Sequence, residues 1–300
     1  MNEITESSEP LIVRHIKLYL FISIELPSVS ISIYIFYKFY HSYEIRSRIN
    51  NHSILALLFV SFIALITELP ITLQYLSSGH VKPADERFCL FWIWYNYSLK
   101  AIDLFLMAWT SIERHILIFH SYLVSTSIGK LKWHYIPLVI CFIYIPLFYF
   151  LCVIIYPCEN NFDYSSHLCH SICFHKITWL SIFDWITNIL LPSLIIEIGS
   201  VTLLIRILIQ FKKMKRTIKW RATRKMALQL ISIASLYSIF WISFTLISII
   251  RLFFIPKFLD KLTLYYFHYS PYFVQLLMPC ICLFCLPELW TRKNRVVPTQ

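Results

Sequence analysis

Five carboxylates in this 300-residue sequence lie inside long apolar stretches, where ionisable groups are rare. They are Glu25, Glu68, Asp103, Asp184 and Glu197. Each costs about 2.5–3.5 kcal/mol at the centre of a membrane helix, so each should face a protein interior or a wet cavity. Asp103 is the deepest, and Lys100 precedes it by one helical turn. The two residues form either a neutral structural pair or part of a site for a ligand or an ion.

No catalytic motif accompanies these carboxylates. The sequence has no HExxH, no GxSxG and no phosphate-binding glycine loop, and it contains only three glycines. The histidines in the apolar stretches are too scattered for a metal site. We therefore expect no enzymatic activity, no metal and no cofactor.

The apolar stretches themselves have the length of membrane spans. Of the 300 residues 58% are hydrophobic and 14% are charged, against about 25% charged residues in ordinary soluble domains. A span needs roughly 20 apolar residues at about 1.5 Å rise each. Seven stretches meet this requirement: 17–39, 53–76, 88–119, 133–156, 177–211, 225–254 and 262–286. The predicted fold is an all-α membrane protein, a seven-transmembrane helix bundle over residues 17–287.

Basic residues gather in alternate connecting segments, which predicts the orientation of the bundle. They follow the first, third, fifth and seventh spans, and they are densest between residues 206 and 225. Because basic loops stay in the cytoplasm, residues 1–16 are predicted to be extracellular and the tail 288–300 cytoplasmic. This placement explains the net charge of +11 without a nucleic acid partner. The densest segment is either a solvated topogenic loop or a contact with membrane lipid.

Four of the nine cysteines fall on the predicted outer side. Cys89, Cys158, Cys169 and Cys173 lie there, whereas the other five lie inside spans, where small apolar packing explains them. The outer side is oxidising, so disulfides are expected. Four cysteines allow three pairings.

The third predicted span has a marker at each end. Cys89 lies at its outer end, and Glu113, Arg114 and His115 lie at its inner end. Arg114 follows Cys89 by 25 residues, a helical rise of about 37 Å. This span resembles the third helix of rhodopsin-like G-protein-coupled receptors, with a disulfide-forming cysteine at the top and an acidic-Arg-aromatic triplet at the bottom. The triplet here is Glu-Arg-His, where the family usually has Asp-Arg-Tyr.

Other spans show partial matches to the same family. Pro192 matches the proline of the fifth helix, Trp241 the aromatic switch of the sixth and Pro279 the proline of the seventh. Ser243 replaces a proline of the sixth helix, and Ser61 replaces the aspartate of the second. The resemblance extends over all seven spans and is typical of a divergent orphan member.

The resemblance implies a plasma-membrane receptor that transmits the binding of an extracellular ligand, either a peptide or a small molecule, to a heterotrimeric G protein. It assigns the activation switch to Glu113, Arg114, His115, Trp241 and Pro279. The alternative for Arg114 is an ordinary interfacial arginine whose guanidinium snorkels to water. The rival class is a seven-span transporter or channel subunit without G-protein coupling, although no internal repeat of the transporter kind is visible.

The resemblance also implies a disulfide between Cys89 and the loop before the fifth span. Cys173 is the preferred partner and Cys169 the alternative. In the preferred pairing, Cys158 and Cys169 close a small loop of their own.

Candidate ligand-binding residues lie in the outer halves of the spans: Trp92, Asn96, Lys100, Asp184, His268 and Tyr272. For the aromatic residues an interfacial belt is the alternative. Monoamine receptors of the family carry an aspartate eighteen residues before the motif arginine; here Asn96 is found, so a monoamine ligand is not expected. Asp103 and Ser61 are candidates for an ion site, since the family's sodium site lies at this depth.

Overall fold

The regular elements of this chain are helices wherever its structure is described. The computed structural model describes residues 10–170, 172–213, 231–253, 262 and 266–285. The α-helices of these ranges are α1 (Leu11–His41), α2 (Tyr43–Arg46), α3 (Ile49–Ile63), α4 (Leu69–Ser78), α5 (Glu86–Phe119), α6 (Ser127–Lys130), α7 (Ile136–Phe150), α8 (Thr178–Asp184), α9 (Leu191–Lys213), α11 (Ser243–Phe253) and α13 (Ser270–Cys285). Short 3-10 turns occur at Ser121–Val124, His167–Cys169, Cys173–Lys176 and Phe267–Tyr269. The predicted tail 288–300, residues 1–9 and residues 214–225 of the basic segment lie outside the described residues.

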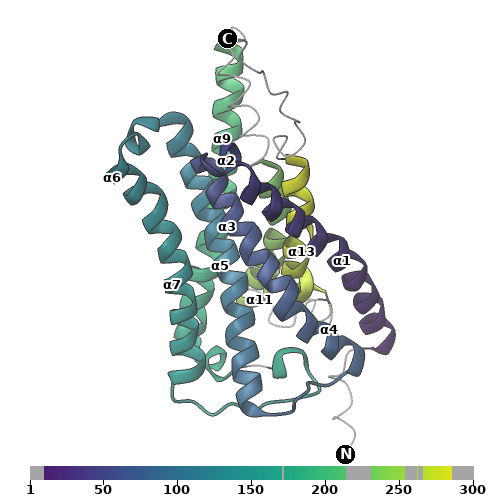
Figure 1. Ribbon diagram of the computed structural model, residues 1–300. Helices are drawn as coiled ribbons and strands as arrows, with labels where there is room; N and C mark the ends of the chain where they lie inside the picture. The colour runs from purple at the N-terminus through teal and green to yellow at the C-terminus, as the bar shows by residue number, and fades with distance from the viewer. Residues whose placement is uncertain (1–9, 171, 214–230, 254–261, 263–265, 286–300) are drawn as a thin grey trace, which may run out of the picture.

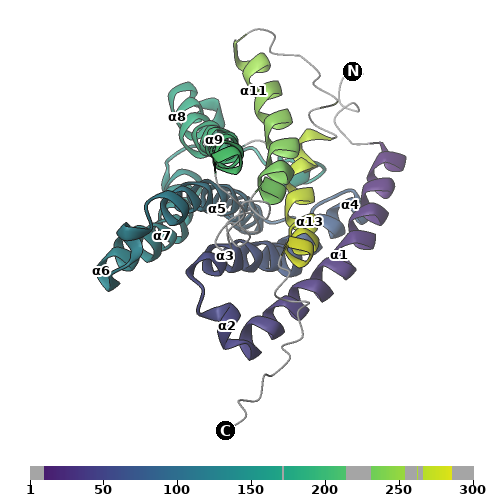
Figure 2. The same ribbon diagram turned by 90° about the horizontal axis from the view of Figure 1, so that it is seen from above.

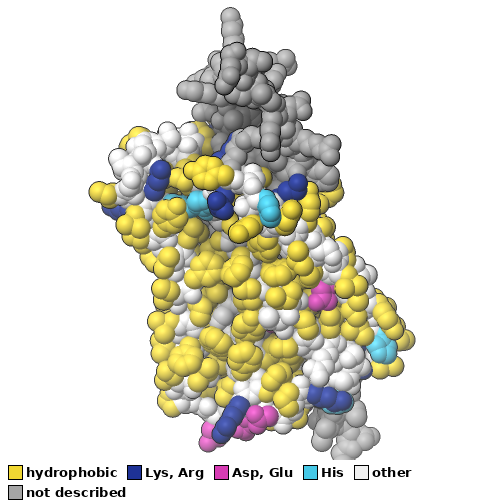
Figure 3. Space-filling model, in the orientation of Figure 1, with side chains coloured by type: hydrophobic (Ala, Val, Ile, Leu, Met, Phe, Trp, Pro, Cys, Tyr) yellow, Lys and Arg dark blue, Asp and Glu magenta, His cyan; other side chains and the backbone are white. Residues whose placement is uncertain are grey.

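Six helical segments are long and apolar enough to cross a bilayer. They are Leu11–His41, Asn51–Ser78, Ser127–Ile155, Thr178–Arg206, Ile231–Ile250 and Phe267–Phe284. They correspond to every predicted span except the third. Figure 3 shows the apolar belt that they form, with charged side chains gathered at its two ends. The chain is therefore an all-helical, multi-pass membrane protein.

Helix α5, the third predicted span, occupies the middle of the bundle. It has 34 residues, a length of about 50 Å, and it packs against α3, α7 and α9, as Figure 2 shows. It is missing from the six apolar segments because charged residues lower its hydropathy. Three of them, Asp103, Glu113 and Arg114, are at most 2% exposed. Neighbouring helices cover these groups, so α5 does not need the apolar surface of a lipid-facing helix.

Proline positions coincide with widened turns in several helices. Four π-helical turns each end two residues before a proline: Ala64–Glu68 before Pro70, Leu131–Tyr135 before Pro137, Leu151–Ile155 before Pro157 and Trp185–Leu190 before Pro192. A proline ring inside a regular helix clashes with the carbonyl of the residue four positions earlier. For Pro70, Pro137 and Pro192, which lie inside helices, that residue falls within the π turn, whose wider backbone relieves the crowding. Glu68 and Asn188, both buried in the bundle, lie within two of these turns.

The loop between residues 156 and 177 folds across the end of the bundle where α5 begins (Figure 1). Two disulfides anchor it, Cys89–Cys169 and Cys158–Cys173, each with a Cα–Cα distance of 5.9 Å. The backbone N–H of Val81 donates to Tyr164 O at 2.7 Å and ties the loop to the segment before α5.

The preferred disulfide pairing was therefore wrong, and the alternative partner Cys169 is correct. Leu168, Cys169 and His170 all have positive φ, between 53° and 72°, so the chain reverses there and turns the Cys169 side chain toward α5. Cys173 lies just before α8 and closes the loop on Cys158 instead. A left-handed run of three non-glycine residues is costly, and the Cys89 cross-link helps to hold it.

Candidate functional site

A hydrogen-bonded network around Glu68 lies beneath this loop. Glu68 is 1% exposed, and its Oε1 accepts hydrogen bonds from four side chains. The donors are Trp92 Nε1 at 3.2 Å, Thr72 Oγ1 at 3.1 Å, Tyr272 Oη at 2.8 Å and the amide of Asn96. The network joins the second predicted span to α5 and α13. A buried carboxylate needs such donors to offset the loss of water.

The sequence shows only part of this network. Trp92 and Asn96 are one helical turn apart on α5 and so share a face. Tyr272 follows Glu68 by 204 positions, and no sequence spacing links them. Trp92 and Tyr272, both predicted to bind ligand, instead belong to the network and are at most 1% exposed.

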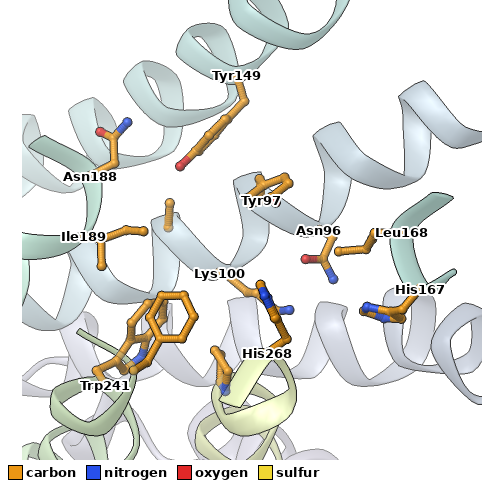
Figure 4. A pocket seen from close by; sticks show the side chains of 13 residues that line it. Asn96, Tyr97, Lys100, Tyr149, His167, Leu168, Asn188, Ile189, Trp241 and His268 are labelled. Carbon is orange, nitrogen blue, oxygen red and sulfur yellow. The ribbon is translucent and has the colours of Figure 1, made fainter. Parts of the chain in front are cut away.

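A cavity of about 550 Å³, including the part open to solvent, lies beside this network. Thirteen described residues line it: Asn96, Tyr97, Lys100, Ala101, Tyr149, His167, Leu168, Asn188, Ile189, Trp241, Phe244, His268 and Pro271. Figure 4 shows how they surround it, with α5 behind and the disulfide-anchored loop contributing His167 and Leu168. Of the six predicted ligand residues, Asn96, Lys100 and His268 lie on its wall.

Lys100 is the cationic group of this cavity. Its ammonium lies over the Tyr272 ring, 4.0 Å from the centroid, and it makes no ion pair with Asp103. Burial, together with the charges of Lys100, His268 and Lys17, lowers the pKa of His167 well below its ordinary value. The His167 ring is therefore neutral at neutral pH.

Asp184 lies behind the cavity wall and does not line it. It is 4% exposed and accepts hydrogen bonds from Tyr149 Oη at 3.0 Å and Asn188 Nδ2 at 2.7 Å. Both donors do line the cavity. Asp184, a predicted ligand residue, is thus not among the described residues that line this cavity, and its carboxylate orients two residues that do.

The candidate ion-site residues are both buried. Ser61 is 0% and Asp103 2% exposed, and neither Ser61 Oγ nor Asp103 Oδ1 hydrogen-bonds to a protein group. Asp103 interacts electrostatically with the hydroxyl of Tyr237 rather than with Lys100. The expectation that all five intramembrane carboxylates face the interior holds for Glu68, Asp103 and Asp184, which are buried. Glu25 on α1 and Glu197 on α9 are only partly buried, and Glu197 accepts a hydrogen bond from Ser238 Oγ.

A second cluster lies at the other end of α5, around Glu113 and Arg114. Each of these residues is 1% exposed. The two carboxylate oxygens of Glu113 accept hydrogen bonds from Ser53 Oγ on α3 and from His134 Nδ1, which precedes α7. The snorkelling alternative for Arg114 requires an accessible guanidinium, and the side chain is enclosed instead.

His134 extends this cluster toward the surface through His52. The ring atoms His134 Nε2 and His52 Nδ1 are 3.2 Å apart, and His52 Nε2 is 2.8 Å from the carbonyl oxygen of Arg46. A carbonyl and a carboxylate only accept, so His52 Nε2 and His134 Nδ1 are the donors in these two contacts. The two rings thus link Glu113 to the carbonyl of Arg46.

His115 connects the same end of α5 to α9. Its Nε2 donates to the carbonyl oxygen of Gly199 at 2.8 Å. A Cβ at Gly199 would come within 2.3 Å of Ser111 Oγ on α5, so a larger residue there would have to displace the Ser111 hydroxyl. The two helices are thus held together where the Glu-Arg-His triplet lies.

The remaining predicted switch residues lie between the two clusters. Trp241 lies within the π-helical turn Ser238–Ile242 and is 6% exposed. Its ring packs edge-on against Phe244 at 6.0 Å, and both line the cavity. Pro279 lies inside α13. The turn at Trp241 forms although Ser243 has replaced the proline.

Comparisons with known proteins leave the family open. Neither a protein-family model nor a curated protein matches this sequence. Among the described residues, no group of three or more histidines, cysteines and acids is placed to hold a metal ion. Function has to be argued from the cavity and the two buried clusters.

Proposed function

We propose that this chain is a rhodopsin-like receptor of the plasma membrane that couples an extracellular ligand to a heterotrimeric G protein. The observation that carries the proposal is the enclosure of Glu113 and Arg114 at one end of α5, with a lined cavity at the opposite end. A receptor of this kind needs a ligand site and a distant switch on one element.

The count of seven spans is part of this proposal. Helix α5 is long enough to cross a bilayer, and its ionisable groups are covered by α3, α7 and α9. Buried charges of this kind are tolerated inside a bundle although they are excluded from lipid. Adding α5 to the six apolar segments gives seven.

The proposed orientation places the Arg114 end in the cytoplasm. The exposed basic residues Arg46, Arg48 and Lys132 lie in segments that adjoin this end, and Figure 3 shows basic side chains and histidines gathered there. The two disulfides lie at the cavity end, which fits an oxidising exterior. The N-terminus is then extracellular.

Activation in this proposal is a shift between two pre-existing arrangements of the helices. In the resting arrangement Glu113 holds Arg114 electrostatically, and His115 ties α5 to α9. A ligand that binds better when the helices part at this end increases the population in which Arg114 faces the G protein. Trp241 lines the cavity and therefore connects ligand contact to the sixth predicted span.

The test expresses the chain with a promiscuous G protein and screens a compound library for calcium responses. We expect a subset of compounds to give responses that Arg114→Ala abolishes while surface expression is retained. Arg46→Ala is the matched control, because Arg46 is exposed at the same end of the bundle. Compound-dependent ion or solute flux that persists in Arg114→Ala cells would instead establish the transporter or channel alternative.

A further inference from the structure

The surface of the cavity is positively charged. Among its 13 described lining residues, Lys100 is the only lysine or arginine, and none is acidic. The carboxylates nearby lie behind the wall, where Glu68 accepts from Asn96 and Asp184 from Asn188. The Lys100 ammonium would repel a cationic molecule in the cavity and attract an anionic one.

Lys100 also has unused hydrogen-bonding capacity. An ammonium has three donors. The Lys100 group lies over the Tyr272 ring and donates no hydrogen bond to any described residue, although it is half-buried. Its stabilisation thus comes from the ring face and from the charge of Glu68. A half-buried ammonium with free donors, facing a cavity, is suited to bind a carboxylate.

Two further wall residues have buried atoms without a partner. Trp241 is 6% exposed and its Nε1–H donates to no protein group; Asn188 is 0% exposed and its Oδ1 accepts from none. The orientation of the Asn188 amide is determined by Asp184, because the carboxylate accepts only from the Nδ2 side. Both atoms are enclosed within the wall, so a ligand in the cavity does not reach them.

We propose that the cavity binds a small aromatic carboxylate. The carboxylate pairs with Lys100, and the ring packs among Trp241, Phe244 and Tyr97. This ligand class rests on the proposed receptor function for its biological meaning.

The test measures binding to the purified full chain in detergent with four matched probes. They are the two acids 4-hydroxyphenylacetate and phenylacetate, the neutral amide of the first acid, and the amine tyramine. We expect both acids to bind at least about tenfold more tightly than the amide and tyramine, because only the acids carry the anion that pairs with Lys100. Equal or tighter binding of the amide or tyramine would overturn the proposal. So would the absence of binding by both acids at about 10 mM, where even fragments bind.

Two variants assign the anion contact to Lys100. Lys100→Gln should weaken binding of the hydroxylated acid by roughly thirtyfold and remove its advantage over the amide, whereas Lys100→Arg should retain both. Unchanged discrimination in Lys100→Gln would contradict the assignment. The ratio of acid to amide binding within wild-type protein remains a valid test if Lys100→Gln folds poorly.

Binding and signalling separate the two proposals. Because the probes are tested on purified protein without a G protein, acid-selective binding supports the ligand class even when no coupling is found in cells. Conversely, coupling to compounds other than anions, with no acid-selective binding, would overturn the ligand class and leave the receptor function standing.

Discussion

At the scale of single residues, His134 is the side chain whose role depends most on its surroundings. It is 0% exposed, donates to Glu113 and contacts His52. His134 competes with Arg114 for the Glu113 carboxylate by donating a hydrogen bond to it. The strength of the Glu113–Arg114 attraction is therefore set partly by a residue outside the Glu-Arg-His triplet.

Replacing His134 by phenylalanine keeps the ring volume but removes the donor. We expect His134→Phe to destabilise the protein by about 1–3 kcal/mol, because a buried carboxylate loses a hydrogen bond. Basal G-protein coupling should fall, since Glu113 then attracts Arg114 alone. Thermal denaturation in detergent and a basal coupling assay measure the two effects. His52→Phe is the control, and it should act in the same direction but more weakly; higher basal coupling in either variant would contradict the competition.

At the scale of elements, the loop 156–177 is built as a lid over the cavity. Two disulfides and the hydrogen bond from Val81 anchor it, and Leu168 and His167 reach the cavity wall. His175 helps to hold the loop in place, because its ring packs edge-on against the rings of Phe174 and Tyr97. The distances between ring centroids are 4.3 Å and 5.8 Å.

The half-buried His175 makes the loop sensitive to acid. Burial lowers the pKa of His175 from 6.5 to about 4, so between these values the unfolded chain binds more protons than the folded one. Stability is therefore complete above about pH 6.5 and falls as the pH drops toward 4, by at most about 1.4 kcal/mol per pH unit.

Melting temperatures of wild type and His175→Phe between pH 4 and 7.5 check this expectation, and the variant should show the shallower dependence. Asp163 of the same loop does not add to the pH dependence in this range. Burial alone would raise the pKa of its carboxyl, but hydrogen bonds from Ser165 and Ser166 lower it below the ordinary value. The contribution of Asp163 to stability is therefore lost only below about pH 4. Parallel pH curves for the two proteins would exclude His175 as the source.

At the scale of the whole molecule, α5 decides both the number of spans and the arrangement of the sites. It contacts α3, α7 and α9, forms part of the cavity with Lys100 and ends at Arg114. If α5 did not cross the membrane, the segments at its two ends would lie on the same side.

Epitope tags inserted at residues 80–85 and at residues 120–126 test this arrangement directly. We expect the first tag to be stained on intact cells and the second only after permeabilisation. Further tags before residue 10 and within residues 212–225 should be outside and inside, respectively. Staining of both α5-flanking tags on intact cells would show that α5 does not span the membrane and would remove the basis of the receptor proposal.

The sequence by itself determined the helical segments and the ends of α5. A membrane helix satisfies its own backbone hydrogen bonds, so its position can be read from a contiguous stretch of apolar residues. The same locality explains why Cys89 and Glu113-Arg114-His115 could be assigned to opposite ends of one helix.

The tertiary structure alone decided the disulfide pairing, the central position of Glu68 and the membership of the cavity wall. Each of these depends on contacts between residues far apart in the chain, such as Cys89 with Cys169 and Glu68 with Tyr272, which are 80 and 204 positions apart. Three successive positive-φ residues reverse the chain at Cys169, and the buried Glu68 lies in a π turn before Pro70. Sequence periodicity assumes regular helices and extended loops, so it could foresee neither feature.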